Sequence, residues 1–166
     1  MRSREKTELI RIYVLSKIRF NEILDKNNIN DNNVDEFKQY AFICINDSSG
    51  EYYHDPLFLS SHSNVLTLFF DDVENDLEMS PTNHNMTRAF TEEDADKVIN
   101  FLNCNKRIKT LLIHCAGGIS RSGAVGTFAL DYYKSDKQRF KEDNPKIIPN
   151  ARVLRMLNNK VNSYDV

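Results

Sequence analysis

Residues 110–133 read TLLIHCAGGISRSGAVGTFALDYY, and this stretch decides the fold. The apolar run 110–113 predicts a strand, and residues 122–133 predict a helix rich in small side chains. The short connection between them contains Gly117 and Gly118, which tolerate backbone dihedrals that other residues resist. The stretch therefore predicts a strand, a tight loop and a helix whose N-terminus faces that loop.

Strands and helices alternate on both sides of this stretch. Further apolar runs predict strands at 9–15, 40–45 and 65–70, and apolar stripes predict helices at 17–26, 91–102 and 150–161. Residues 46–63 and 73–90 are expected to be irregular connections. This alternation is typical of an α/β fold: a three-layer sandwich with a central, mostly parallel sheet of four to five strands flanked by helices.

The composition fits one globular domain spanning residues 1–166, with 40% hydrophobic and 28% charged residues. The formal net charge of -2 makes nucleic acid an unexpected partner. No apolar run approaches the ~18 residues of a membrane span, and a signal peptide is not expected. Three cysteines without a CxxC or HExxH motif suit a reducing, cytoplasmic compartment, and neither a metal nor an organic cofactor is expected.

The loop after residue 114 combines a cysteine with an anion-binding pattern. Cys115 is followed after five residues by Arg121, whose guanidinium fork suits two phosphate oxygens. The backbone amides between them can point inward as a nest, and the next helix directs its positive end at the same place. These amides belong to Ala116, Gly117, Gly118, Ile119 and Ser120. Such a positive field favours a nucleophilic Cys115 thiolate, whereas the alternative is a buried structural cysteine.

The segment HCAGGISRSGA resembles the signature loop of the Cys-based protein tyrosine phosphatase superfamily. It is closest in style to dual-specificity phosphatases, whose loops often read HCxAGxxRS. The strand ending in Asp-Asp and the stretches FTEEDADKVINFL and NPKIIPNARVLRML resemble compact, dual-specificity-like bacterial phosphatases. The resemblance is most specific in residues 109–130 and weak before residue 40. It implies a phosphatase fold and hydrolysis through a phosphocysteine.

The resemblance implies a role for each matched position. Cys115 would be the nucleophile, Arg121 would bind phosphate and stabilise the transition state, and the backbone of residues 116–120 would hold the phosphate oxygens. Ser122 would hydrogen-bond the thiolate and ease its departure. His114 would orient the loop, although it can equally be a core histidine. Asn150 would support the loop, although a helix N-cap is at least as good an interpretation.

The resemblance also implies an upstream aspartate as general acid. Asp71 and Asp72 follow the third predicted strand, and Asp72 is favoured over Asp71. Asp72 lies 43 residues before Cys115, which is longer than usual for this resemblance. The extra length falls within residues 73–90, so that Glu74, Asp76 and Glu78 stay open as alternatives.

The interior of the loop carries no lysine and no second arginine, which favours substrates with a single phosphoryl group. The expected partner is a phosphorylated protein or a small phosphomonoester: phosphotyrosine, with phosphoserine or phosphothreonine also plausible. The alternatives are an inactive phosphate-binding module, an inositide phosphatase, and a nucleic-acid end-processing phosphatase. Arsenate reduction or sulfur transfer would need Cys44 or Cys104 to approach Cys115.

Overall fold

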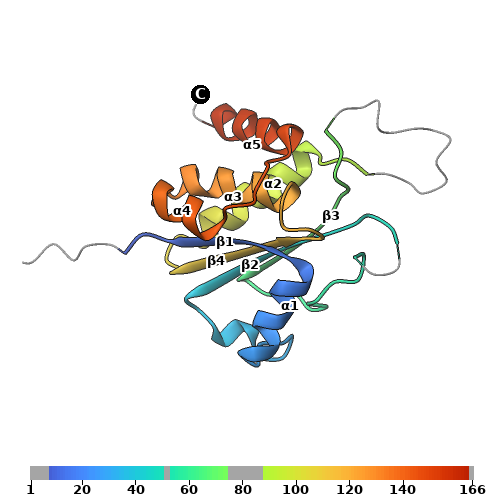
Figure 1. Cartoon of the computed structure of the whole chain (residues 1–166), viewed down its shortest axis with the longest axis vertical. Coiled ribbons are helices and arrows are strands. Elements are labelled where there is room, and N and C mark those ends of the chain that lie inside the picture. The colour runs from blue at the N-terminus through green and yellow to red at the C-terminus, as the bar shows by residue number, and fades with distance from the viewer. Residues whose placement is uncertain (1–7, 51–52, 75–87, 165–166) are drawn as a thin grey trace, which may run out of the picture.

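A computed structural model describes residues 8–50, 53–74 and 88–164. Its elements follow in the order β1 (Arg11–Ser16), α1 (Lys17–Lys26), the 3-10 helix η1 (Val34–Glu36), β2 (Tyr40–Asn46), β3 (Val65–Phe69), α2 (Glu92–Cys104), β4 (Thr110–Cys115), α3 (Arg121–Tyr132), α4 (Lys137–Asp143) and α5 (Ala151–Ser163). The four strands form one sheet in the order β1-β4-β2-β3, and every neighbouring pair is parallel. Helices α2 to α5 cover one face and α1 with η1 the other (Figure 1), which confirms the expected three-layer α/β fold.

The two central strands are apolar because both faces of the sheet are covered. Phe42 of β2 lies opposite Leu112 of β4, and both side chains belong to the core cluster on the α1 side. The next residues, Ile43 and Ile113, are also opposite each other and belong to the cluster on the other side. The pleat thus divides one continuous apolar run between two cores.

Side-chain caps mark the starts of two helices. Thr91 and Asp94 form a reciprocal capping box at the start of α2, and Ser16 caps α1 by accepting from the Arg19 amide. No helix in the described ranges is long and apolar enough to cross a membrane.

Two short elements were not expected from the sequence. Helix α4 buries only Phe140, so the sequence has no apolar periodicity there that would predict a helix. The 3-10 helix η1 lies in residues 27–36, a polar, Asn-rich segment that is expected from its sequence to be a loop or a helix end. The residue after α4, Asn144, accepts from the Val14 amide at 2.7 Å and donates to the Ile12 carbonyl at 2.9 Å. Asn144 therefore covers the outer edge of β1, which would otherwise expose unpaired backbone groups.

Parallel strands place all four carboxyl ends at one edge of the sheet. These ends are Ser16, Asn46, Phe69 and Cys115. Ligands of open α/β sheets bind at this edge.

Candidate active site

The loop between β4 and α3, residues 115–121, is seated on the end of β1. Gly118 has a φ of +68°, and a Cβ added there would lie 2.3 Å from the Leu15 carbonyl carbon and the Ser16 nitrogen. Backbone cannot move aside as a flexible side chain can, so that only glycine fits. The Lys17 amide also donates to the Ala116 carbonyl at 3.3 Å. The junction of β1 and α1 therefore fixes the shape of the loop.

The Cys115 sulfur lies at the floor of this loop and is surrounded by hydrogen-bond donors. The Gly118 amide donates to Sγ at 3.2 Å, and the Ser122 hydroxyl lies 3.0 Å from Sγ. Both groups can donate to a thiolate, and the N-terminus of α3 adds its positive end at the same place. Two possible donors and a helix N-terminus therefore converge on the sulfur.

Arg121 is buried and is held along one side of its guanidinium. Its Nη1 donates to Asp47 Oδ1 at 2.7 Å and to the Phe70 carbonyl at 2.8 Å. Its Nε is buried without a hydrogen-bond partner among the residues that the structure describes. A buried, unpaired donor on a cation is costly, and an oxyanion bound in the loop would satisfy it.

Asp47 was not singled out from the sequence, although a signal was present. It follows β2 directly, and therefore lies at the same edge of the sheet as Cys115. The rule that directed attention to Asp71-Asp72 and His114-Cys115 applies equally to Asn46-Asp47.

The two candidate acids, Asp71 and Asp72, have different hydrogen-bond partners. The Asp71 carboxylate accepts from the Ser48 amide at 2.9 Å, from the Ser48 hydroxyl and from the Arg88 amide at 2.7 Å, and so holds neighbouring backbone together. Asp72 Oδ1 instead accepts from the hydroxyl of Ser120, within the loop, at 2.7 Å. Only Asp72 of this pair is bonded to the loop. Of the other candidates, Glu74 is exposed, and Asp76 and Glu78 lie outside the described residues.

Asn150 combines both interpretations offered for it. Its Oδ1 caps α5 by accepting from the Val153 amide at 3.0 Å. Its Nδ2 donates to Asp72 Oδ1 at 2.7 Å, and its backbone amide donates to the Ser120 carbonyl at 3.0 Å. Asn150 is therefore a helix cap that also joins Asp72 to the loop.

His114 packs on the other side of the sheet from Cys115. Its ring lies 4.6 Å from that of Phe20, and neither ring nitrogen has a hydrogen-bond partner in the described part of the chain. Burial lowers the pKa of His114 to about 3; the Cys115 backbone opposes this effect, and the positive charges of Lys17 and Arg121 add to it. A neutral, enclosed imidazole without a described hydrogen-bond partner favours the core-histidine interpretation.

The other cysteines are badly placed to react with Cys115. Cys44 lies opposite His114 and belongs to the core on the α1 side, whereas Cys115 belongs to the other core. Burial also raises the pKa of the Cys44 thiol. Cys104 ends α2 and is exposed near the start of β4, roughly 15–20 Å from the far end of that strand. This placement argues against a resolving cysteine and hence against arsenate reduction.

Residues 8–50, 53–74 and 88–164 contain no group of three or more His, Cys, Asp or Glu side chains that could hold a metal ion.

No family model matches the sequence, and no curated protein matches it significantly. Among solved structures, the chain is similar to the PTP-2 phosphatase of Cydia pomonella, with a TM-score of 0.50 and 16% identity over 90% of this chain and 84% of that chain. Human DUSP28 matches with a TM-score of 0.48 and 15% identity over 95% and 98% of the two chains. The human tyrosine phosphatase-like serine/threonine/tyrosine-interacting protein matches with a TM-score of 0.43 and 21% identity over 91% and 87%.

Proposed function

Because the chain has the fold of the Cys-based protein tyrosine phosphatase superfamily, we propose that it hydrolyses phosphomonoesters, phosphotyrosine among them, through a phosphocysteine intermediate. One observation carries the proposal. The Cys115 sulfur accepts a hydrogen bond from the Gly118 amide, and the same loop ends at Arg121, whose buried Nε has no hydrogen-bond partner among the described residues. A nucleophile and an anion-binding donor thus occupy one loop.

In the first step, the Cys115 thiolate attacks phosphorus in line with the leaving oxygen. The phosphorus–sulfur bond forms while the phosphorus–oxygen bond breaks, and Asp72 gives its proton to the leaving oxygen. Arg121 Nε–H and the loop amides stabilise the charge on the equatorial oxygens.

In the second step, Asp72 takes a proton from water, and the resulting oxygen attacks phosphorus. The phosphorus–sulfur bond breaks, inorganic phosphate leaves, and the thiolate is restored with Ser122 Oγ as its donor at 3.0 Å. Within the described chain, both hydrogen bonds to Asp72 fall on Oδ1. We therefore assign the transferred proton to Oδ2.

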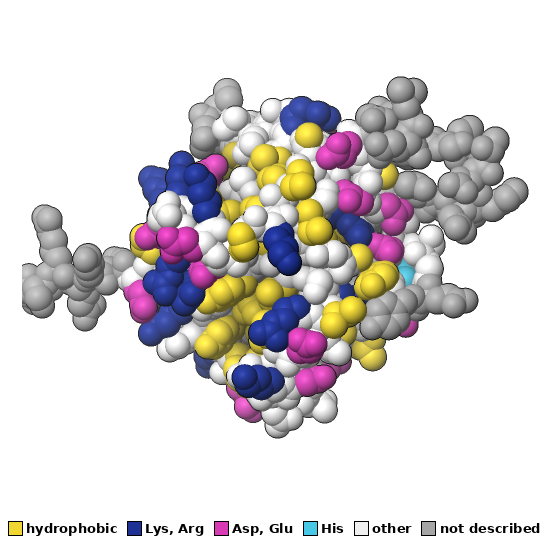
Figure 2. Space-filling model, in the orientation of Figure 1, with side chains coloured by type: hydrophobic (Ala, Val, Ile, Leu, Met, Phe, Trp, Pro, Cys, Tyr) yellow, Lys and Arg dark blue, Asp and Glu magenta, His cyan; other side chains and the backbone are white. Residues whose placement is uncertain are grey.

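An inactive phosphate-binding module is the second candidate, because the same cradle would bind phosphate without turnover. Two further substrate classes have less support. The loop offers no extra cation for an inositide. Figure 2 shows Lys and Arg side chains interspersed with acidic and hydrophobic ones on the visible face, which is not the continuous basic surface expected for nucleic acid.

The test is to measure phosphate release from p-nitrophenyl phosphate, phosphotyrosyl and phosphothreonyl peptides and a soluble inositol phosphate. Cys115→Ser should abolish turnover and keep ligand binding, whereas Arg121→Ala should impair both. Cys104→Ser is the matched control, since Cys104 is exposed and distant, and it should keep full activity. Turnover by Cys115→Ser would refute the mechanism. Phosphopeptide binding without turnover by the wild type would favour the inactive module.

A further inference from the structure

The outer edge of the sheet is open at the amino end of β1. The Arg11 amide donates to the Lys109 carbonyl at 2.9 Å, and successive residues of a strand direct their backbone groups to opposite sides, so that those of Ile10 and Ile12 point away from β4. Asn144 covers this edge only from the Ile12 carbonyl onward. Within residues 8–50, 53–74 and 88–164, no hydrogen bond is made by the Ile12 amide or by the Ile10 amide and carbonyl. Unpaired groups on a strand edge are a template for a further strand.

The same two isoleucines line a cavity of about 620 Å³ between helix α4 and the amino ends of β1 and β4. Figure 1 shows α4 beside β1 at this edge of the sheet. Leu130 and Phe140 are buried and form the cavity floor, whereas Leu9 and Tyr40 are 54% and 40% exposed and lie at its mouth. The volume is within the range of roughly 300–1,000 Å³ that is typical of ligand sites. The cavity therefore offers main-chain pairing and apolar contact in one place.

The charged side chains of the cavity include one cation without an ion pair. The charged residues that line it are Glu8, Arg11, Lys109, Asp136, Arg139 and Asp143. Arg11 donates twice to Asp143, each time at 2.8 Å. Lys109 lies 3.7 Å from Glu8. The Asp136 carboxylate caps α4 by accepting from the Arg139 amide at 3.0 Å, whereas the Arg139 guanidinium makes no ion pair or hydrogen bond with any residue that the structure describes. An acidic side chain of a ligand would complement this guanidinium.

We propose that an extended peptide segment of another protein binds in this cavity and pairs with Ile10 and Ile12 as a fifth strand of the sheet. An apolar side chain of the segment would lie against the cavity floor, and an acidic side chain would lie beside Arg139. The occupant is a single strand and not the sheet of a second copy, because α4 and Asn144 lie beside the open edge. A second copy would bring its own α4 into the same space.

The proposed site is separate from the loop that begins at Cys115. Thr110 lines the cavity at one end of β4, and Cys115 lies at the other end, roughly 16 Å away. A bound segment would therefore leave that loop accessible. The inference goes beyond the proposed hydrolysis and does not depend on it.

The probe is an acetylated and amidated heptapeptide of alternating valine and threonine with a glutamate at its centre, titrated into the isotope-labelled full chain. Binding should saturate with a dissociation constant below about 1 mM, and the amide signals of Ile10 and Ile12 should change more than that of Gly118. Two further versions of the peptide are N-methylated at odd or at even positions. Only one set of amides faces the strand edge, so that one version should bind at least about tenfold more weakly than the other.

Variants of the protein test the same contacts. Ile10→Pro removes an outward amide without breaking a bond to β4 and should weaken binding at least about fivefold, whereas Ile10→Val keeps the amide and is the matched control. Arg139→Glu should weaken binding of the glutamate peptide about threefold and should affect a glutamine version less.

Three results would overturn the inference: no saturable binding below about 1 mM, equal binding of the two methylated versions, or signal changes confined to the loop at Gly118. Self-association of the chain that Ile10→Pro abolishes, without peptide binding, would assign the edge to a second copy and would also overturn it. If Ile10→Pro unfolds, the methylated peptides and Arg139→Glu still decide. Loss of phosphatase activity in the wild type would leave this inference unaffected, since none of these measurements uses turnover.

Discussion

Replacing Asp47 should disorder the Arg121 guanidinium and leave the nucleophile in place. The two side chains form an ion pair of 2.7 Å, with Arg121 only 7% exposed and Asp47 31% exposed. The Phe70 carbonyl accepts from the same nitrogen at 2.8 Å. Together these acceptors hold Nη1 and so restrict the orientation of the guanidinium.

The size of the effect follows from this geometry. A hydrogen bond to a charged group contributes about 1.5–3 kcal/mol, and breaking a fully buried ion pair costs about 3–5 kcal/mol. Asp47 is partly solvated and the Phe70 carbonyl remains as an acceptor, so that Asp47→Ala should cost about 1.5 kcal/mol of unfolding free energy. A similar loss of transition-state stabilisation would lower kcat/KM about tenfold. Asp47→Asn keeps an acceptor oxygen and should fall between the wild type and Asp47→Ala.

The assay is kcat/KM for p-nitrophenyl phosphate, together with inhibition by inorganic phosphate and urea unfolding. Asp131→Ala is the control, because Asp131 is exposed and makes only a loose ion pair of 3.7 Å with Lys137. If Asp47→Ala instead kept or raised kcat/KM and tightened phosphate binding, Asp47 would be a competitor for the guanidinium. The positioning role would then be refuted.

Three other perturbations test the loop, the acid and a distant charged cluster. Gly118→Ala should cost about 2–5 kcal/mol of unfolding free energy in urea, from left-handed strain and the backbone clash, whereas Gly117→Ala should cost far less. Asp72→Asn should lower kcat for phenyl phosphate about 100-fold, whereas Asp71→Asn should chiefly lower stability; the opposite ranking would make Asp71 the acid. Hydrogen bonds to two aspartates raise the pKa of His62 in the folded protein above its ordinary value. The charged imidazolium therefore contributes to the free energy of unfolding in full below pH 6.5. This contribution is lost as the pH rises through the higher pKa of the folded state. The urea midpoint should therefore fall from pH 6.5 to 8.5 by more in the wild type than in His62→Gln, and equal slopes would contradict the assignment.

The sequence predicted the elements whose apolar pattern is long and periodic. The four strands and helices α1, α2, α3 and α5 were placed within a few residues, because each buries several side chains at regular spacing. Helix α4 buries only Phe140, and short helices of this kind are stabilised by tertiary contacts that a local pattern does not contain. The same limit applies to Asn144, whose contacts with β1 are 130 and 132 residues away in sequence.

The residues of the candidate site also fall into two groups: those that local sequence predicts and those that depend on the fold. The loop from Cys115 to Arg121 is continuous, so its residue types and spacing could be read directly from the sequence. Choosing between Asp71 and Asp72 requires knowing which direction each side chain takes after β3, and adjacent residues differ in that respect. The contact between Asp47 and Arg121 could not be predicted from local sequence, because the two residues are 74 positions apart.

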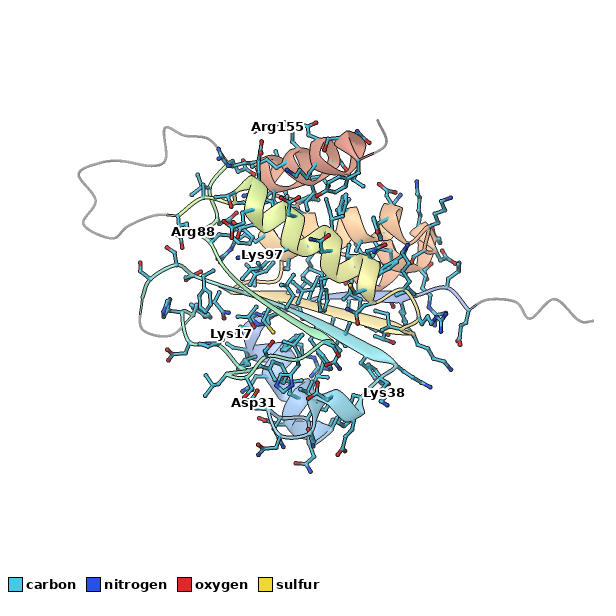
Figure 3. The ribbon with its side chains drawn as sticks, turned by 180° about the vertical axis from the view of Figure 1, so that it is seen from behind. Lys17, Asp31, Lys38, Arg88, Lys97 and Arg155 are labelled. Atoms are coloured by element: carbon cyan, nitrogen blue, oxygen red, sulfur yellow. The ribbon has the colours of Figure 1, made fainter. Side chains whose placement is uncertain are left out.

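The sheet topology explains why these distant groups meet. Each of the four strands ends at one edge and contributes there: β1 supplies the backbone on which Gly118 rests, and β4 supplies Cys115. The residue after β2, Asp47, and the carbonyl after β3, at Phe70, hold Arg121 from two neighbouring strands. The amide of Arg88, on the segment leading into α2 (Figure 3), donates to the Asp71 carboxylate, whereas Asp72 accepts from Ser120 of the loop. A change that shifts any one strand end should therefore alter the Arg121 guanidinium, the Cys115 sulfur and the Asp72 carboxylate together, because all three are positioned by the same edge of the sheet.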